Sequence, residues 1–154
     1  MHLYLVQHAE AKKEEEDPER GLTDGGFRDI ARTALFAREQ GVIVRTILHS
    51  GKKRALQTAQ TLANYLRPEK GVEQAEGLSP LDDPAIWADR LAGMHDDSML
   101  VGHLPHLAQL ASLLLCGDRD KNCVVFPAAG IICLRRFEDG NWSVVWMITP
   151  GIIR

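Results

Sequence analysis

His8 stands where a short apolar segment near the amino end of the chain stops. The four residues Leu3–Val6 are apolar, Gln7 and His8 follow them, and the chain then becomes polar. A short apolar run of this kind indicates a buried strand. Ligands of open α/β sheets bind outside the carboxyl ends of the strands, where His8 would lie. Because a neutral imidazole is a good nucleophile near pH 7, we interpret His8 as a candidate acceptor of a phosphoryl group.

Two more predicted strands end at polar side chains. The β-rich stretch Val42–Leu48 is followed by His49 and Ser50, and the apolar stretch Ser98–Gly102 runs directly into His103. The carboxyl ends of parallel strands meet at one edge of a sheet, so we expect the polar side chains at the three strand ends to lie close together. One histidine is weak evidence, but several such residues at the same type of location make a candidate site.

Basic residues crowd the start of the next predicted helix, over residues 52–66. Lys52, Lys53 and Arg54 all lie at its amino end, although cations are favoured at the opposite end of a helix. We interpret the misplaced Arg54 as a sign of a nearby anion such as phosphate, and expect the two lysines to be solvated. Arg20, where the chain turns back after an acidic loop, is a second candidate cation.

The remaining elements follow from periodicity, caps and turn signals. Thr23 and Asp83 are typical helix N-caps, and Asp139-Gly140 is a strong hairpin signal. The predicted helices lie between Thr23 and Gly41, over 52–66, from Asp83 to Gly93 and over 105–115. The predicted strands are 3–6, 42–48, 72–75, 98–102, 124–126, 129–134 and 142–148. This alternation predicts an α/β three-layer sandwich: a mixed, mostly parallel central sheet, helices on both faces and a C-terminal antiparallel hairpin.

Length and composition indicate an ordinary globular protein. The 154 residues suit a single domain over 1–154, and the 45% hydrophobic and 25% charged fractions are unexceptional. The net charge of -3 does not favour nucleic acid or an acidic membrane as a partner. We find no apolar run that could span a bilayer and no signal peptide, and therefore expect a cytoplasmic protein. The three cysteines lack a metal-binding spacing; we expect reduced thiols, with Cys116 and Cys133 as packing residues.

Four segments in chain order resemble those of the histidine phosphatase superfamily, in its small branch of SixA-like phosphohistidine phosphatases. The resemblance covers nearly the whole chain. The family usually has Arg-His-Gly, then Arg-x-Leu-Thr-x-x-Gly, then Ser-x-x-x-Arg-Ala-x-Gln-Thr, and finally its second histidine. The corresponding segments here are Gln7-His8-Ala9, Arg20–Gly26, His49–Ala59 and Val101–Pro105. Two residues depart from the first pattern, because Gln7 replaces an arginine and Ala9 a glycine.

This resemblance implies a catalytic role for His8 and His103 and a phosphate-binding role for Arg20 and Arg54. Guanidinium groups match the non-bridging oxygens of a transferred phosphoryl group. Gln7 and Ser50 would add hydrogen bonds to the same phosphate. The phosphoryl group would pass to His8 and then to water, without a metal or another cofactor. The implied substrate is phosphohistidine on a protein in signal transduction, such as a histidine phosphotransfer domain, or a small phosphorylated molecule.

The acid that would protonate the leaving group is not identified by any motif. Glu76, Asp82 and Asp83 lie in a suitable part of the chain, but Asp83 is better explained as a helix N-cap. The missing acid favours phosphohistidine over a phosphate ester, because the N–P bond breaks readily whereas an alkoxide needs protonation.

Three other interpretations stay open. The protein could be a phosphatase for small phosphate esters, with the same fold and nucleophile. Because Gln7 brings no positive charge, it could also be a weakly active module that binds phosphate or phosphohistidine. A metal site would use His8, His49, His103 and His106, but their spacing matches no recognised ligand set. We expect His49 and His106 to lie behind the site or on the surface.

Overall fold

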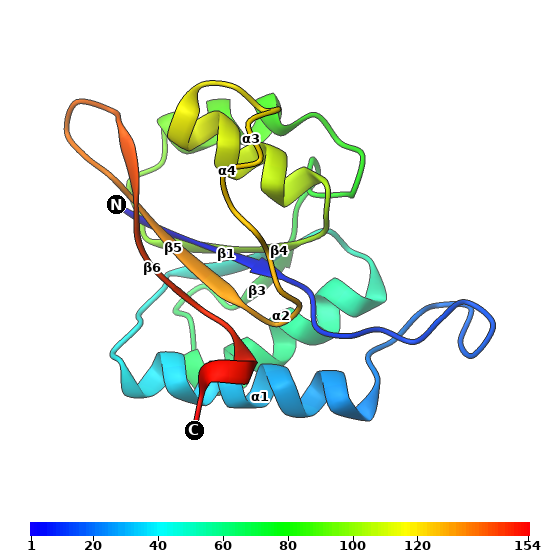
Figure 1. The fold of residues 1–154 in the computed structure, drawn as a ribbon. Coiled ribbons are helices and arrows are strands. Elements are labelled where there is room, and N and C mark those ends of the chain that lie inside the picture. Colours follow the sequence, from blue (N-terminus) through cyan, green and yellow to red (C-terminus); the bar gives the residue numbers. More distant parts are fainter.

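The computed structural model describes residues 1–154 as one six-stranded sheet between two layers of helices (Figure 1). The strands are β1 (His2–Gln7), β2 (Thr46–His49), β3 (Val72–Gln74), β4 (Ser98–Gly102), β5 (Ile131–Arg136) and β6 (Trp142–Ile148). The helices are α1 (Asp24–Glu39), α2 (Lys53–Leu66), α3 (Pro84–Ala92) and α4 (His106–Cys116), and the 3-10 turn η1 (Pro150–Ile152) follows β6.

The order of the strands places β1 and β4 side by side in the middle of the sheet. The order is β3-β2-β4-β1-β5-β6, and β3, β2, β4 and β1 are parallel to one another. β5 is antiparallel to β1, and β6 is antiparallel to β5. The predicted mixed, mostly parallel sheet with a C-terminal hairpin is therefore confirmed. Since β1, β2 and β4 are parallel, their carboxyl ends lie at one edge of the sheet.

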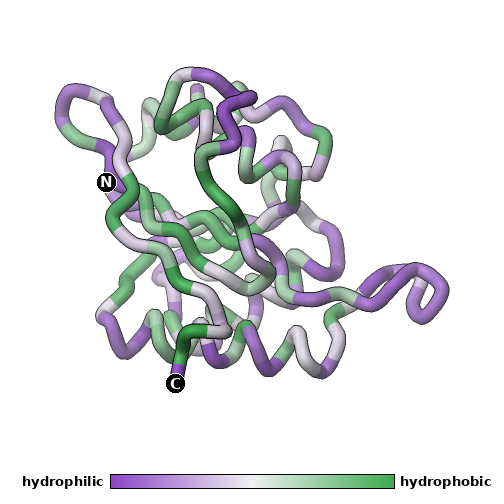
Figure 2. Tube along the Cα trace, viewed as in Figure 1, coloured by the Kyte–Doolittle hydropathy of each residue, from purple (hydrophilic) through white to green (hydrophobic).

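The two helical layers cover opposite faces of the sheet, and each face has its own apolar core. Along β1, Val6 packs on the side of α1 and α2, whereas Leu5 packs on the side of α3 and α4. Both side chains are fully buried, and each such burial contributes about 1.5–3 kcal/mol. Figure 2 shows hydrophobic residues along the sheet and a hydrophilic loop that protrudes between β1 and α1.

The predicted helix caps are confirmed. The hydroxyl oxygen of Thr23 accepts a hydrogen bond of 2.9 Å from Gly26 N, and the carboxylate of Asp83 accepts one of 3.0 Å from Ala85 N. Gly26 is required for packing, because a Cβ there would lie 2.2 Å from the carbonyl oxygen of Glu10. The start of α1 thus lies directly against the loop that follows β1. None of the helices is long and apolar enough to cross a membrane.

Two strand predictions are wrong in part. β2 begins at Thr46 rather than Val42; Val42 and Val44 are buried in the core, but their backbone lies outside the sheet. Residues 124–126 form no strand, although the side chain of Phe126 is buried. In both segments, side chains enter the core from loops, and burial alone gives the same apolar pattern as a strand.

The prediction for the cysteines holds for one residue and fails for another. Cys133 is buried in β5, as expected. Cys116 is exposed, because α4 ends at this residue and Gly117 turns the chain away with a φ of 70°. Apolar neighbours in sequence therefore do not place Cys116 in the core.

Candidate active site

The backbone around His8 is anchored on both sides of the residue. His8 N donates to the carbonyl oxygen of Gly102 in β4 at 3.1 Å, and Ala9 N donates to the hydroxyl of Thr58 in α2 at 3.0 Å. The Nδ1 atom of His8 lies 2.7 Å from the carbonyl oxygen of Ala9. A carbonyl only accepts, so Nδ1 carries the proton and donates it. The lone pair on Nε2 is then free for nucleophilic attack.

His103 lies next to His8, as the strand ends predict. The two imidazole rings have centroids 5.1 Å apart and are tilted by 53°. His103 is 2% exposed, and its Nε2 lies 2.6 Å from the hydroxyl oxygen of Ser50. Ser50 Oγ also accepts a hydrogen bond of 3.3 Å from Lys52 N, at the start of α2. The ends of β1, β2 and β4 thus bring His8, Ser50 and His103 together.

Arg20 and Arg54 bring two positive charges to the same place. Both guanidinium groups lower the pKa of His8, and Arg20 contributes, after burial, to lowering the pKa of Arg54. Neither arginine forms an ion pair with a carboxylate, and the Nε atom of Arg54 is buried without a hydrogen-bond partner. Two close cations with no counter-ion indicate a binding site for an anion.

The loop that carries Arg20 is tightly held. Arg20 has a φ of 52°, a left-handed conformation that is uncommon outside glycine. The carboxylate of Asp17 accepts hydrogen bonds from Glu19 N at 3.0 Å and from Gly21 N at 2.9 Å, on either side of Arg20. Arg20 Nε donates to the carbonyl oxygen of Lys12 at 3.1 Å. The turn therefore sets the direction of the guanidinium group.

Lys53 is solvent-accessible, as expected, and it also forms ion pairs that the sequence did not indicate. Its ammonium group lies 3.1 Å from a carboxylate oxygen of Glu19 and 3.8 Å from one of Asp17. Lys53 therefore helps to hold the loop of Arg20 against α2. Lys52, the preceding residue, is exposed and forms no ion pair.

Two residues that support the site, Gln57 and Thr58, were not singled out from the sequence, although both lie in a motif segment. Gln57 accepts a hydrogen bond of 2.8 Å from Leu22 N, and Thr58 accepts the one from Ala9 N. Both follow Arg54 on α2 and belong to the same motif segment. One helix therefore supplies a cation, holds the Arg20 loop and holds the loop of His8. The motif itself was the available signal.

Burial keeps both imidazoles neutral in the free protein. Burial, together with the charges of Arg54 and Arg20, lowers the pKa of His8 to about 4, against the effect of its hydrogen bond to Ala9. Burial, followed by the nearby His8 and Arg54, lowers the pKa of His103 to about 3. At pH 7 the free site thus combines two neutral imidazoles with two guanidinium cations.

Three buried polar atoms around this site lack any partner: Gln7 Oε1, Arg54 Nε and His103 Nδ1. Buried polar groups are normally hydrogen-bonded, and leaving one unpaired costs about 1–3 kcal/mol. Such atoms gathered at the ends of two neighbouring strands and an adjoining helix are typical of a site prepared for a polar ligand. A tetrahedral oxyanion supplies the acceptor that the Nε–H of Arg54 needs.

His49 and His106 form no hydrogen bond with His8, Ser50 or His103. His49 is buried, and its Nδ1 accepts a hydrogen bond of 3.0 Å from Gly51 N. His106 is fully buried, so neither histidine is on the surface. No group of three or more His, Cys, Asp or Glu side chains is placed to hold a metal ion.

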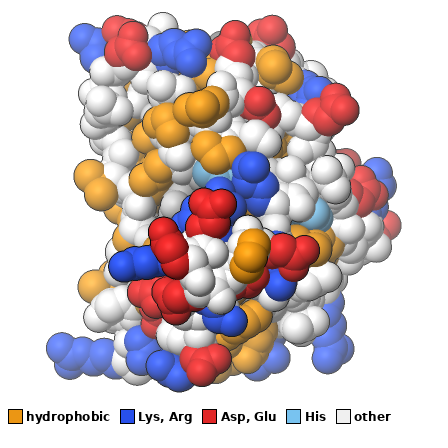
Figure 3. Space-filling model, turned by 90° about the vertical axis from the view of Figure 1, so that its right-hand side faces the viewer, with side chains coloured by type: hydrophobic (Ala, Val, Ile, Leu, Met, Phe, Trp, Pro, Cys, Tyr) orange, Lys and Arg blue, Asp and Glu red, His pale blue; other side chains and the backbone are white.

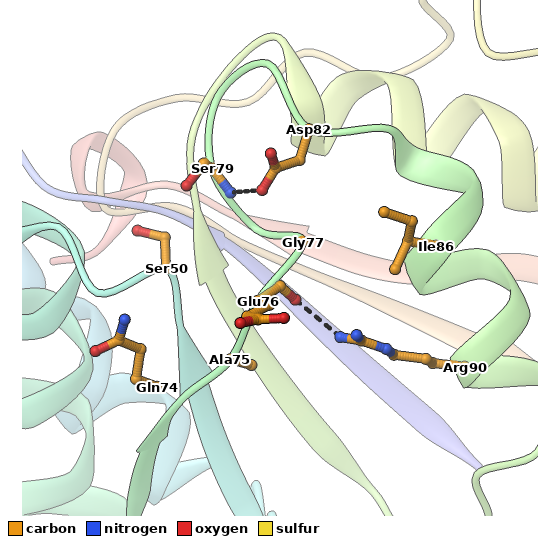
Figure 4. Close-up of a pocket in the computed structure, with 9 residues that line it drawn as sticks. All are labelled: Ser50, Gln74, Ala75, Glu76, Gly77, Ser79, Asp82, Ile86 and Arg90. Carbon is orange, nitrogen blue, oxygen red and sulfur yellow. Dashed lines mark hydrogen bonds between the residues drawn. The ribbon is translucent and has the colours of Figure 1, made fainter.

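Glu76 and Asp82 line a cleft together with Ser50 (Figure 4). Asp83 lies outside this lining and caps α3. Figure 3 views the side toward which β1 points, where basic side chains lie beside a histidine and acidic ones surround them.

Comparison with known proteins agrees with this geometry. No family model matches the chain. It is 23% identical to phosphohistidine phosphatase SixA of Escherichia coli K12 over 155 residues, which are 97% of this chain and 94% of that protein. It is 34% identical over 143 residues to an uncharacterized protein of Picosynechococcus, covering 88% and 85% of the two chains. The structure of SixA complexed with tungstate matches with a TM-score of 0.88 and 23% identity over 100% of both chains.

The chain thus has the SixA fold, and over nearly its whole length its sequence is similar to that of a SixA phosphohistidine phosphatase. The two departures from the usual Arg-His-Gly segment of the histidine phosphatase superfamily, Gln7 and Ala9, differ in their structural consequences. Ala9 has no positive φ, so the residue that replaces glycine is not strained. Gln7 stands where the superfamily usually has an arginine, and its Oε1 atom is buried without a partner.

Proposed function

We propose that this protein is a phosphohistidine phosphatase that removes phosphate from phosphohistidine on a protein, through a phosphohistidine intermediate on His8. The observation that carries the proposal is the free Nε2 of His8 beside His103 and two unpaired arginines. The similar SixA protein was solved with tungstate, an oxyanion with the tetrahedral shape of phosphate. A metal is not part of the proposed reaction.

The first step transfers the phosphoryl group to the protein. Nε2 of His8 attacks phosphorus, the new N–P bond forms, and the bond from phosphorus to the leaving imidazole breaks. Negative charge spreads over the three non-bridging oxygens, where the guanidinium groups of Arg20 and Arg54 stabilise it. In the tautomer with a proton on Nε2, His103 donates to the hydroxyl oxygen of Ser50 at 2.6 Å, and the hydroxyl proton of Ser50 is then free to be donated to a phosphoryl oxygen.

The second step returns the protein to its starting state. Water attacks phosphorus, the bond to His8 Nε2 breaks, and inorganic phosphate leaves. The hydrogen bond from Nδ1 to the Ala9 carbonyl persists in both steps and keeps the ring in the required tautomer. The same geometry therefore serves phosphorylation and hydrolysis of His8.

Phosphohistidine on a protein suits the site better than a phosphate ester. An ester needs an acid for its alkoxide, and neither Glu76 nor Asp82 forms a hydrogen bond with His8, Ser50 or His103. The proposed partner is a protein that carries phosphohistidine in cytoplasmic signal transduction, such as a histidine phosphotransfer domain.

The test compares release of phosphate from a phosphohistidine protein and from an aryl phosphate, with the wild type and His8→Ala. We expect the wild type to prefer phosphohistidine and His8→Ala to lose the activity. Arg54→Ala should lower kcat by roughly a hundredfold, because one lost charge-stabilising group costs about 3 kcal/mol. Faster turnover of the ester, or full activity of His8→Ala, would contradict the proposal.

Gln7 supports one alternative, a module that binds phosphohistidine and hydrolyses it slowly. The amide can donate to phosphate but adds no charge to Arg20 and Arg54. This alternative predicts tight binding of a phosphohistidine protein together with phosphate release no faster than spontaneous hydrolysis. Measuring binding and release on the same sample separates the two functions.

A further inference from the structure

A cleft of about 440 Å³ opens next to the phosphate-binding residues (Figure 4). Ser50 forms one wall, and the rest comes from the segment between β3 and the last turn of α3. In Figure 4 the hydroxyl groups of Ser50 and Ser79 lie on one side of the cleft, and Arg90 reaches into it from α3. The volume is sufficient for a long side chain.

Ser50 connects this cleft to the reacting groups. Its hydroxyl oxygen lies 2.6 Å from His103 Nε2, and the ring of His103 lies 5.1 Å from that of His8. A substrate whose phosphoryl group contacts His8 therefore places the residues next to its phosphohistidine within reach of the cleft. The cleft is thus positioned to contact the residues that neighbour the phosphohistidine in the substrate.

Two carboxylates, Glu76 and Asp82, and one guanidinium group, Arg90, line the cleft, so the net charge of its lining is negative. The side chain of Glu76 has no hydrogen-bond or ion-pair partner, and one oxygen of the Asp82 carboxylate accepts from Ser79 N at 2.9 Å. The single cation, Arg90, comes from α3 and contacts neutral groups rather than a carboxylate. It donates to the carbonyl oxygen of Glu76 at 2.8 Å and lies 5.0 Å from the centre of the Trp87 ring.

We propose that this cleft binds a lysine or arginine that neighbours the phosphohistidine of the protein substrate. The inference rests on the proposed function and adds a substrate class to it. The site then has two poles: Arg20 and Arg54 hold the anionic phosphoryl group, and Glu76 with Asp82 holds the neighbouring cation. The apolar stem of such a side chain packs against Ile86, which also lines the cleft. A substrate with a carboxylate beside its phosphate is disfavoured by the same charges.

The test uses phosphohistidine peptides that are identical except for a lysine, an alanine or a glutamate next to phosphohistidine. Glu76 is exposed, and exposed ion pairs contribute about 0.2–1 kcal/mol, so we expect kcat/KM to favour lysine over alanine by up to about fivefold. Glutamate should rank last. Raising the salt concentration should reduce the preference, since exposed charges are screened.

Glu76→Gln tests whether the charge of Glu76 causes the preference for lysine. The substitution removes the charge and keeps the hydrogen bonds that the backbone carbonyl of residue 76 accepts from Trp87 and Arg90. The ratio of kcat/KM for the lysine and alanine peptides should fall toward one, and Glu76→Lys should reverse it. Glu73→Gln is the matched control: this exposed glutamate lies in β3 outside the cleft, and the ratio should not change.

The possible failures are distinguishable. Equal rates for all three peptides, or a ratio unchanged in Glu76→Gln, would overturn the inference while phosphohistidine hydrolysis stands. Failure to hydrolyse any of the peptides and a whole phosphohistidine protein would overturn the proposed function itself.

Discussion

At the scale of single residues, the state of the two imidazoles decides what the site can do. Burial lowers the pKa of His8 to about 4 and that of His103 to about 3. A bound dianion brings negative charge next to both rings and favours their protonated forms. We therefore expect tungstate or phosphate to raise both pKa values, which an NMR titration of the histidine ring protons would measure. Unchanged titration curves with saturating tungstate would show that the anion binds elsewhere.

Gln7 allows a direct test of the missing charge. Gln7→Arg adds a guanidinium group where the superfamily usually has one, and charge-assisted hydrogen bonds contribute about 1.5–3 kcal/mol. Inhibition by tungstate should strengthen by tenfold or more, as measured from Ki. The same variant should unfold at a lower temperature without tungstate, because a third cation joins Arg20 and Arg54. Gln7→Met, which keeps the volume without the amide, is the control; equal Ki values for all three proteins would contradict a phosphate contact at this position.

At the scale of elements, α2 organises the site through hydrogen bonds as well as through Arg54. Gln57→Ala leaves Leu22 N without its acceptor and frees the loop of Arg20, at a cost of about 1–3 kcal/mol. We expect a lower melting temperature, a weaker tungstate Ki and reduced kcat/KM. Gln60→Ala, at an exposed position of the same helix, should change none of these. A Gln57→Ala protein with wild-type tungstate affinity would show that Arg20 needs no such support.

The sequence predicts elements well where local signals determine them. The caps at Thr23 and Asp83 place two helix starts, and the alternation of elements gives the sheet. The prediction fails where tertiary contacts decide, because Val42 and Phe126 are buried from loops rather than from strands. The convergence of His8, Ser50 and His103 was predictable from parallel strand ends. The hydrogen bonds of Gln57 and the ion pairs of Lys53 depend on how a distant loop folds back, which no local pattern encodes.

At the scale of the whole molecule, the buried histidines make the fold sensitive to acid. Unfolded histidines bind protons near pH 6.5, whereas folded His8 and His103 bind them only near 4 and 3. Between about pH 6.5 and 4 the unfolded chain therefore binds more protons, and the free energy of unfolding falls as the pH falls. Burial also lowers the pKa of His106 and His49, which acts in the same direction.

Urea denaturation at a series of pH values would measure this effect. The free energy of unfolding should be greatest above pH 6.5 and should decrease steadily toward pH 4. Replacing His103 by glutamine should make the dependence shallower, because one proton-linked group is lost. A stability that is constant or rises over this range would contradict neutral, buried imidazoles.

The central claim is that His8 Nε2 carries the phosphoryl group during turnover, and trapping the intermediate tests it most directly. The protein is mixed with a ³²P-labelled phosphohistidine protein, quenched with alkali, which preserves phosphohistidine, and mapped by mass spectrometry. We predict label on His8 at Nε2 that disappears when unlabelled substrate is added, with none on His8→Ala. Phosphate release at the full rate with no label on His8, or label that stays on His8 through the chase, would contradict the account.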